Sequence, residues 1–379
     1  MSIYLDNSAT TRPCDAAVQA MLHAMQEDFY NPSALYAPAM GPEKMMKKCR
    51  DVILQSVHAP QGSRVVFLSG GTEADNLAIL GQQKKCRDKR ILYSAGEHPA
   101  VKEACQAVEG AQAVAVPYTR EGVVDLEALD ALMDESVALI CIMQVNNETG
   151  AIQPLKEIGE MKRRLCPQAH FHVDGVQGYL RVPFDMKACH ADSYALSGHK
   201  IHAPKGIGAL VMGPAMQVRA RQVGGGQENM IRSGTENTVG IAGLLAAIEA
   251  FPKAHNMQQV KMHLYEGLQK LIPGALVNGP RPDSANAAPH ILNISLPPVR
   301  SETMLHALEG EKIYVGIGSA CSSHKQKVSA VLKAMHVDQA LAESALRFSF
   351  CPNNTMEEMN TVLEAVKSQY SLLSRFQRR

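Results

Sequence analysis

The chain alternates between two patterns of apolar residues. Short apolar runs have the length of buried β-strands, and the segments between them repeat apolar residues at the period of a helix. The predicted strands are residues 65–69, 91–95, 113–116, 137–143, 170–174, 193–197 and 207–212. The predicted helices are residues 43–58, 126–134, 155–165 and 239–250, with a further helix from Thr72. This alternation indicates an α/β fold, with a mainly parallel sheet covered by helices on both faces.

The pattern changes after Pro252. A strand at 291–296 and helices at 301–309 and 356–373 follow in a more mixed order. We interpret this segment as a second, smaller α+β domain. Ligands of parallel sheets bind beyond the carboxyl ends of the strands, so the loops after the strands of the first part should carry the chemistry.

Three of these loops contain polar groups that suit one cofactor. Residues 69–73 join a strand to a helix through two glycines, so backbone N–H groups could hold a phosphate at the helix N-terminus. Asp174 ends a strand, and Lys200 follows the next one in Ser-Gly-His-Lys. A desolvated lysine is a nucleophile toward carbonyl groups. A phosphate cradle, a carboxylate for the ring nitrogen and a lysine for the Schiff base are what pyridoxal 5'-phosphate (PLP) requires.

The same residues allow other interpretations. Thr72 and Asp174 could each cap a helix, and Lys200 could be a solvated charge. His98 follows a strand, where it could be an acid, a base or a stacking partner, or purely structural. His199 and His202 lack the carboxylate of a zinc-protease motif, so we predict no metal site.

Composition narrows the classes of function. The chain has 379 residues, with 38 Lys and Arg against 37 Asp and Glu, and no Trp. A nucleic-acid binder usually has a basic excess, so no direct nucleic-acid partner is predicted. No apolar run approaches the ~18 residues of a membrane span, and the first residues do not resemble a signal peptide. We expect a cytoplasmic protein that is not bound to a membrane.

One of the nine cysteines differs from the others. None forms a C-x-x-C pair, so neither a zinc site nor a thioredoxin-like motif is indicated. Most are expected to be small buried hydrophobes. Cys321 instead lies among Gly, Ser and Ala in a predicted loop, with His324 and Lys325 close behind it. Nearby cations lower the pKa of a thiol and exposure lets it react, so Cys321 is the candidate reactive thiol.

Several motifs occur together along the chain. They are residues 4–11 (YLDNSATT), 69–76 (SGGTEADN), 97–98 (EH), 145–150 (VNNETG), 172–177 (HVDGVQ), 197–200 (SGHK), 224–228 (GGGQE), 232–235 (RSGT), 318–321 (GSAC) and 346–349 (LRFS). In combination they resemble the PLP-dependent cysteine desulfurases of the NifS/IscS type, within the class-V aminotransferase-like group. The resemblance covers nearly the whole chain.

The resemblance implies a role for each matching position. Lys200 would hold PLP, His98 would stack on its ring and shuttle protons, Arg347 would bind the substrate carboxylate, and Cys321 would take the sulfur. Asn147 would contact both cofactor and substrate. The other implied cofactor-binding residues are Gly71, Thr72, Asp174, Gln177, Ser197, His199 and, from the other subunit of a homodimer, Thr235.

The resemblance also implies PLP fold type I, which is aspartate aminotransferase-like. A large domain, residues 14–252, would contain a seven-stranded, mainly parallel sheet. Residues 1–13 and 253–379 would form the small domain that carries the cysteine loop. That loop resembles those that hand sulfur directly to a partner protein, and iron–sulfur scaffolds, tRNA-thiolation proteins and a dedicated enzyme are all open as acceptors.

Three features depart from the family pattern. Phe350-Cys351-Pro352 stands where relatives have Leu-Gly-Arg, and Pro38 stands where relatives have a His before Gly41. The chain also ends soon after its last predicted helix, whereas some relatives have a longer tail. These departures concern partner choice and loop packing more than PLP binding.

The leading hypothesis is a cysteine desulfurase that converts L-cysteine to L-alanine and holds the sulfur as a persulfide on Cys321. The enzymatic alternative is another class-V reaction, such as that of a selenocysteine lyase or an aminotransferase; an aminotransferase would not need Cys321. A third hypothesis is an inactive PLP-fold protein that acts as an interaction scaffold. The intact Lys200, Asp174 and Arg347 argue against it.

Overall fold

The structure, a computed structural model, describes residues 2–318 and 329–375. Within these ranges the main sheet has seven strands in the order β2–β8–β7–β6–β5–β3–β4. They are β2 (Arg64–Leu68), β3 (Arg90–Ser94), β4 (Gln112–Val116), β5 (Val137–Met143), β6 (His170–Asp174), β7 (Ser193–Ser197) and β8 (Gly208–Met212). Strand β8 runs antiparallel to both neighbours, because its connection from β7 is too short for a crossover helix. The predicted mainly parallel seven-stranded sheet is confirmed.

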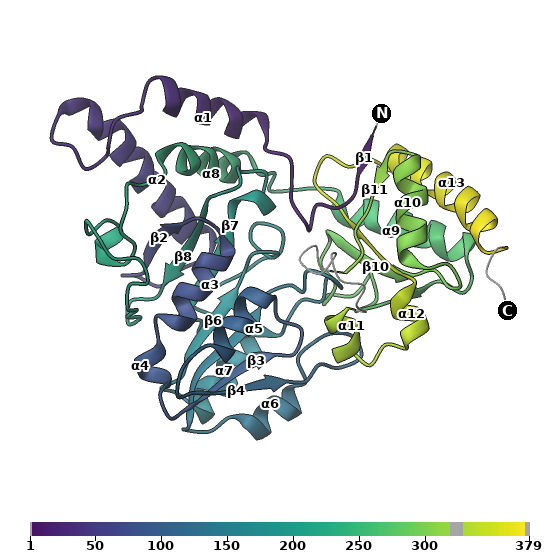
Figure 1. The fold of residues 1–379 in the computed structure, drawn as a ribbon, viewed down its shortest axis with the longest axis horizontal. Coiled ribbons are helices and arrows are strands. Elements are labelled where there is room, and N and C mark those ends of the chain that lie inside the picture. Colours follow the sequence, from purple (N-terminus) through teal and green to yellow (C-terminus); the bar gives the residue numbers. More distant parts are fainter. Residues whose placement is uncertain (1, 319–328, 376–379) are drawn as a thin grey trace.

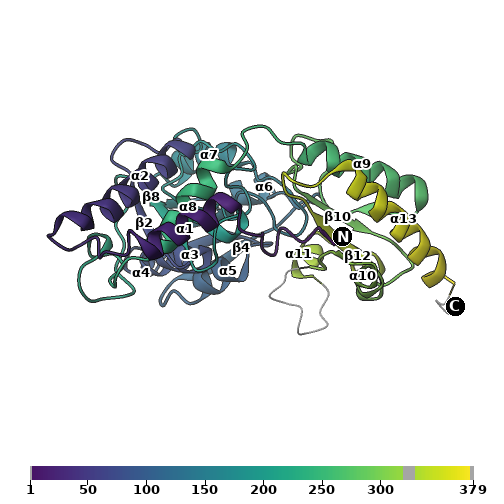
Figure 2. The same ribbon diagram turned by 90° about the horizontal axis from the view of Figure 1, so that it is seen from above.

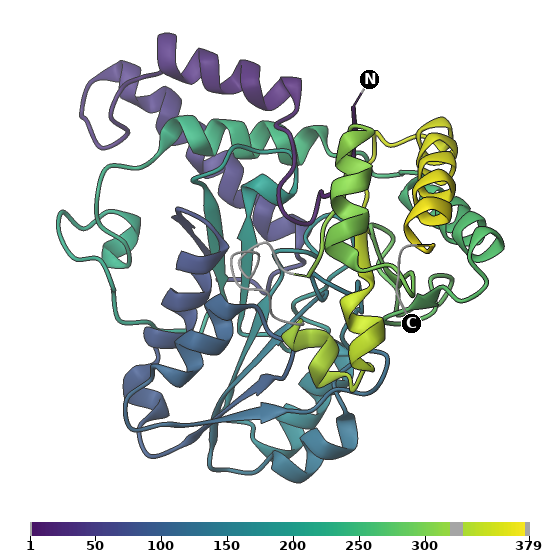
Figure 3. The ribbon, with the colours of Figure 1, turned by 45° about the vertical axis from the view of Figure 1, so that its right-hand side comes forward.

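Helices cover both faces of this sheet (Figures 1 and 3). On one face, Val65 and Phe67 of β2 share an apolar core with α2 (Met40–Ser56), α7 (Leu155–Leu165) and α8 (Thr238–Ala250). On the other face, Val66 and Leu68 pack with α3 (Gly71–Leu80). The remaining helices here are α1 (Asp15–Gln26), which packs along α8, α4 (Gln83–Cys86), α5 (Pro99–Gln106), α6 (Leu126–Leu132), and the 3-10 turns Ala37–Ala39, Gly198–Lys200 and Glu228–Met230.

A second apolar core lies at one end of the elongated molecule (Figure 2). It is built on the antiparallel sheet β12–β10–β9, and the parallel pair β1–β11 joins it. Its elements are β1 (Ile3–Tyr4), α9 (Met257–Leu271), β9 (Leu276–Val277), β10 (Ile291–Ser295), α10 (Ser301–Gly310), β11 (Ile313–Tyr314), β12 (Ala345–Ser349) and α13 (Met356–Leu373). Ile3 and Leu5 therefore belong to a core otherwise made by the C-terminal third of the chain.

Two short helices, α11 (Ala330–Ala334) and α12 (Gln339–Glu343), precede β12 in the sequence. Val331 and Leu332 belong to the core of the large sheet, so this part of the predicted small domain packs on the large one. The division into residues 14–252 and the rest stays a prediction.

The predicted strands lie within one residue of the observed ones at each end. The predicted helix 43–58 begins earlier, at Met40, because Pro42 is allowed in the first turn of a helix. In the part of the chain that the structure describes, no helix is long and apolar enough to cross a membrane.

Candidate active site

The carboxyl ends of the parallel strands border a pocket of about 220 Å³. Ten residues singled out in the sequence line it together: Gly71, Thr72, His98, Asn147, Asp174, Gln177, Ser197, His199, Lys200 and Arg347. The rest of the lining is Ser8, Ala9, Asp75, Met143, Val145 and Val176. The pocket therefore joins loops of the large sheet to the N-terminal segment and to β12.

One wall of the pocket is the N-terminus of α3. Gly70 is the N-cap residue and no side chain caps this helix, so Thr72 does not act as its N-cap. A Cβ atom on Gly71 would lie 2.5 Å from Val176 Cγ2, and glycine is therefore needed for the helix to start so close to the turn after β6. The unpaired N–H groups of this first turn, with the Ser197 hydroxyl in the same lining, form a site suited to phosphate.

Lys200 lies in the 3-10 turn after β7. Its Nζ atom donates to the carbonyl oxygens of Ser8 and Ala9, the second at 2.9 Å. Burial, and then the positive charges of Arg347 and Arg181, lower the pKa of the amine to about 7. A large share of this amine is unprotonated at neutral pH, which is the form that reacts with an aldehyde.

Asp174, at the end of β6, is buried. Its Oδ1 atom accepts a hydrogen bond from the Val176 N–H at 2.9 Å, and the chain continues as a turn rather than a helix, so Asp174 is not a helix cap. Burial raises the pKa of its carboxyl group, while His98, the Val176 N–H and Lys200 oppose that shift. A buried carboxylate in this place suits the ring nitrogen of PLP.

Two more buried carboxyl groups lie near Asp174, and the sequence analysis did not identify them. Asp75 Oδ1 is 3.1 Å from His172 Nε2, and His172 Nδ1 is 2.8 Å from Ser193 Oγ. Burial, and then the charge of Asp174, raise the pKa of Asp75 well above its usual value. Burial likewise raises the pKa of Glu97 and lowers that of His172 to about 3. Burial therefore favours the protonated forms of Asp75 and Glu97, whereas the positive charge of Lys200 favours the charged form of Asp174.

A sequence signal for Asp75 does exist. It lies one helical turn after Gly71 in α3, on the same face of the helix. Its place in the 69–76 motif therefore points it toward the pocket, whereas its partner His172 is distant in sequence.

His98 caps a helix and also lines the pocket. It is the N-cap of α5, and its Nδ1 atom accepts a hydrogen bond from the Ala100 N–H at 3.1 Å. Burial lowers the pKa of the ring, so at neutral pH the ring is neutral and its proton is on Nε2. The structural and the functional interpretations of His98 are compatible.

Arg347, in the middle of β12, is 2% exposed. Its Nη2 atom donates to Asp6 Oδ1 at 2.6 Å, and its Nη1 atom donates to the carbonyl oxygens of Asn147 and Gly318 at 3.0 and 2.8 Å. Its Nε atom is buried and has no hydrogen-bond partner among the described residues. A buried guanidinium with an unused donor is suited to a substrate carboxylate.

Two predicted site residues are not among the described residues that line this pocket. Thr235 is exposed and lines a separate pocket with Glu228 and Arg232. Cys321 lies outside the described residues. Gly318, the last described residue before Cys321, accepts a hydrogen bond from Arg347 and therefore lies beside the pocket.

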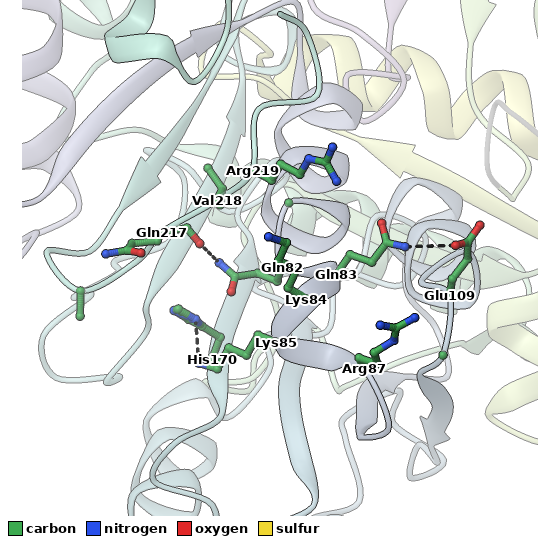
Figure 4. Close-up of a pocket in the computed structure, with 13 residues that line it drawn as sticks. Gln82, Gln83, Lys84, Lys85, Arg87, Glu109, His170, Gln217, Val218 and Arg219 are labelled. Atoms are coloured by element: carbon green, nitrogen blue, oxygen red, sulfur yellow. Dashed lines mark hydrogen bonds between the residues drawn. The ribbon is translucent and has the colours of Figure 1, made fainter.

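A larger pocket, of about 1040 Å³, is lined by His170 at the start of β6 and by residues of α4, among others (Figure 4). Burial also lowers the pKa of Lys85 there. The one carboxylate in that lining is Glu109, which accepts a hydrogen bond from Gln83. Because the lining offers no strand-end carboxylate beside a lysine, it does not match a PLP site. Across residues 2–318 and 329–375, no cluster of three His, Cys, Asp or Glu side chains could hold a metal ion.

The residues of the smaller pocket fit PLP. Besides Arg347 Nε, the Ser8 hydroxyl is buried in the lining without a partner in the described part of the chain. Buried polar groups are rarely left unpaired, so these atoms point to polar groups on a ligand. Lys200, Asp174 and the α3 N-terminus supply the three contacts that the aldehyde, the ring nitrogen and the phosphate require.

Known proteins resemble this chain over nearly its whole length. The sequence profile of the family described as Aminotransferase class-V matches residues 3–362. Cysteine desulfurase NifS of Azotobacter vinelandii is 36% identical over 374 residues, covering 96% of this chain and 91% of that protein. Cysteine desulfurase IscS of Methanosarcina thermophila is 37% identical over 375 residues, with coverage of 96% and 91%. A solved NifS-like protein has a TM-score of 0.89 at 31% identity, covering 98% of this chain and 100% of that chain.

The sheet topology and the lysine and aspartate that line the pocket define a PLP-dependent enzyme of fold type I. The chain belongs to the class-V aminotransferase family, in its group of NifS/IscS-type cysteine desulfurases. The family, the fold class and the cofactor predicted from the sequence are confirmed.

Proposed function

We propose that the protein is a cysteine desulfurase that converts L-cysteine to L-alanine and holds the sulfur as a persulfide on Cys321. The observation that carries this proposal is that Lys200, Asp174 and Arg347 line one pocket. The first two match a PLP site, and Arg347 adds a site for the carboxylate of an amino acid. The relatives named above are cysteine desulfurases, which favours this reaction over others of the class.

Each group of residues in the pocket has its own role. Bound PLP supplies an electron sink that stabilises negative charge at the substrate Cα atom. Lys200 holds the cofactor and Asp174 pairs with its ring nitrogen. His98 stacks on the ring and shuttles a proton through Nε2, since its Nδ1 is occupied by Ala100. The remaining contacts come from Gly71, Thr72, Ser197 and His199 to the phosphate, and from Asn147 and Gln177 to the ring substituents.

Cys321 completes the reaction. Its thiolate attacks the sulfur of the bound cysteine, so that an S–S bond forms while the Cβ–S bond breaks. The electron pair of the broken bond stays on the carbon, which takes up a proton and gives alanine. An added thiol then reduces the persulfide and releases sulfide.

The first prediction tests the whole assignment. Purified protein is expected to be yellow, and borohydride should fix PLP onto the peptide that contains Lys200. With cysteine and a thiol reductant, alanine and sulfide should appear in equal amounts. Labelling of another buried lysine, such as Lys261, or production of a keto acid in place of alanine would contradict the proposal.

The second prediction concerns Arg347. Arg347→Lys removes the planar pair of donors that a carboxylate requires, and Lys cannot replace it. Losing one charged hydrogen bond costs about 1.5–3 kcal/mol, so cysteine should bind about 10- to 100-fold more weakly. The cofactor spectrum without substrate should not change. Wild-type efficiency on cysteine would place the carboxylate site elsewhere.

A homodimer is part of the proposal. Large apolar side chains are exposed on α1 and on the segment that follows it: Val18, Leu22, Met25, Phe29, Leu35, Tyr36 and Met40. On α1 they recur at helical spacing and form a stripe of the kind that a second subunit covers. Thr235, exposed and outside its own pocket, would then reach the partner's phosphate site.

The third prediction tests this dimer. Leu22→Asp should give a monomer with reduced PLP occupancy, as measured by sedimentation and absorbance. Leu372→Asp, on the exposed surface of α13, is the matched control and should stay dimeric. A Leu22→Asp monomer with full PLP occupancy would refute a phosphate site shared between subunits.

We also propose that the protein acts in the cytoplasm and passes its sulfur to an acceptor protein of iron–sulfur cluster assembly or tRNA thiolation. The support is the resemblance of residues 318–321 to the cysteine loops that deliver sulfur directly. Incubating the persulfide form with candidate acceptors, followed by mass spectrometry, identifies the one that takes the sulfur.

A further inference from the structure

Arg181 is a buried cation beside the PLP site, and none of the roles above involves it. It lies in the turn that follows β6 and is 4% exposed. Its Nη1 atom donates to Gln177 Oε1 at 3.2 Å, and its Nη2 atom donates to the backbone carbonyl of Lys200. One guanidinium therefore connects two segments that supply residues to the pocket.

The charge of Arg181 is not neutralised locally. Both of its hydrogen bonds go to neutral oxygens, and no carboxylate of the described residues forms an ion pair with it. Burial lowers its pKa only to about 10, so it remains charged at neutral pH. A buried ion without an opposite charge is destabilising. A residue kept at that cost is a candidate for a role in the site.

The guanidinium also determines how the Gln177 amide is oriented. Arginine has donors and no acceptor, so the amide atom that faces it must be Oε1. The amide nitrogen then faces the opposite way, where it donates to the carbonyl of Ser8 at 2.9 Å. That nitrogen carries two N–H groups, and Ser8 takes one of them. The second is left for an acceptor such as an oxygen substituent of the cofactor ring.

We propose that Arg181 is a positioning residue that holds the Gln177 amide with an N–H toward the cofactor and fixes the backbone of Lys200. This inference rests on the proposed roles of Gln177 and Lys200. Arg181 does not line the pocket itself, but it orients the side chain of Gln177, which does.

The position of Arg181 has an electrostatic consequence for Lys200. Its positive charge disfavours protonation of the Lys200 amine, as does that of Arg347, whereas two carboxylates favour it. The charged and titratable groups around this amine are Arg347 from β12, Arg181 from the turn after β6, Asp6 from the N-terminal segment, Asp174 from β6, His98 from the start of α5 and the adjacent His199.

Three variants separate the effects. Arg181→Met removes both the donors and the charge. Arg181→Lys keeps the charge but lacks the planar guanidinium whose two separate nitrogen atoms reach the two acceptors. Lys261→Met is the control, because Lys261 is a fully buried cation that donates to a backbone carbonyl, that of Ala288, but belongs to the other core.

Each apoprotein is titrated with PLP, and the rate of bond formation to Lys200 is followed by absorbance as a function of pH. Arg181→Met should bind PLP more than about 10-fold more weakly, since it loses two hydrogen bonds to a charged donor. Its pH midpoint should rise by about half a unit or more, because a repelling charge is gone. Arg181→Lys should keep the wild-type midpoint and bind PLP about 3- to 10-fold more weakly. Lys261→Met should match the wild type in both measurements.

Wild-type PLP affinity in Arg181→Met would overturn the inference. Equal losses in Arg181→Met and Lys261→Met would also overturn it, because the effect would then follow from losing any buried cation. If Arg181→Met does not fold, wild-type affinity in Arg181→Lys overturns it instead. Borohydride labelling of a lysine other than Lys200 in the wild type would refute the proposed function itself, which distinguishes the two failures.

Discussion

Cys321→Ser is expected to keep the yellow colour and the binding of cysteine but to lose more than about 10³-fold in alanine production, a loss typical of removing a nucleophile. PLP can activate the substrate, but it offers no atom that stores the sulfur. A serine oxygen at this position is not a substitute, because it does not form a stable bond to sulfur in place of the S–S bond. Alanine formation with a thiol reductant present and mass spectrometry of the persulfide are the measurements.

Cys351→Ser is the matched control. Cys351 is the nearest other cysteine in the C-terminal part of the chain, and burial raises the pKa of its thiol, so it remains a poor nucleophile. This variant should turn over cysteine at the wild-type rate. A persulfide that maps to Cys351, or full activity of Cys321→Ser, would contradict the role given to Cys321.

Asp174→Asn and Asp75→Asn are expected to have very different affinities for PLP, although both replace a buried aspartate in the same pocket. Asp174→Asn removes the carboxylate that we propose pairs with the ring nitrogen, so PLP should bind about 10- to 100-fold more weakly. Burial, and then the charge of Asp174, raise the pKa of Asp75, which favours its neutral form. Asparagine keeps its shape and the oxygen that lies 3.1 Å from His172, so PLP affinity should change less than about 3-fold.

The measurement is titration of each apoprotein with PLP, followed by cysteine turnover. Asp174→Asn should lose more in turnover than in affinity, because the electron sink depends on a protonated ring nitrogen. Equal losses in the two variants would mean that the aspartates share the negative charge and that Asp174 is not its sole carrier.

The large sheet was predictable because most of its strands contain a short run of apolar residues. All seven residues of β5 are buried, so no polar residue interrupts the run that marks it. Strand β12 is equally buried, but Arg347 stands in its middle and breaks the apolar pattern. Helix α1 was not predicted from the sequence. Its exposed side carries the apolar residues Val18 and Leu22, so the alternation of apolar and polar residues that marks a helix is weak there.

Some residues of the site could also be found from the sequence, and others only from the structure. Lys200 and Asp174 could be found because each follows a predicted strand, and parallel strands bring their carboxyl ends together. Arg181 and His172 could not, because their roles depend on partners such as Gln177, Lys200 and Asp75 whose contacts only the folded chain creates. The reaction itself came from the family resemblance, since a pattern of residues does not distinguish cysteine from other amino acids.

The N-terminal segment has a consequence for how the enzyme is made in the cell. Asn7 Nδ2 donates to the carbonyl of Ser349 at 2.8 Å, and the Ser8 N–H donates to its hydroxyl at 2.8 Å. The carbonyls that hold the Lys200 amine thus belong to a segment that is itself held by the last strand. On the ribosome, the large sheet can fold while β12 is still unsynthesised. Nascent chains are therefore expected to capture PLP only after β12 has been synthesised, so a shortage of the cofactor would not affect the earlier folding of the large sheet.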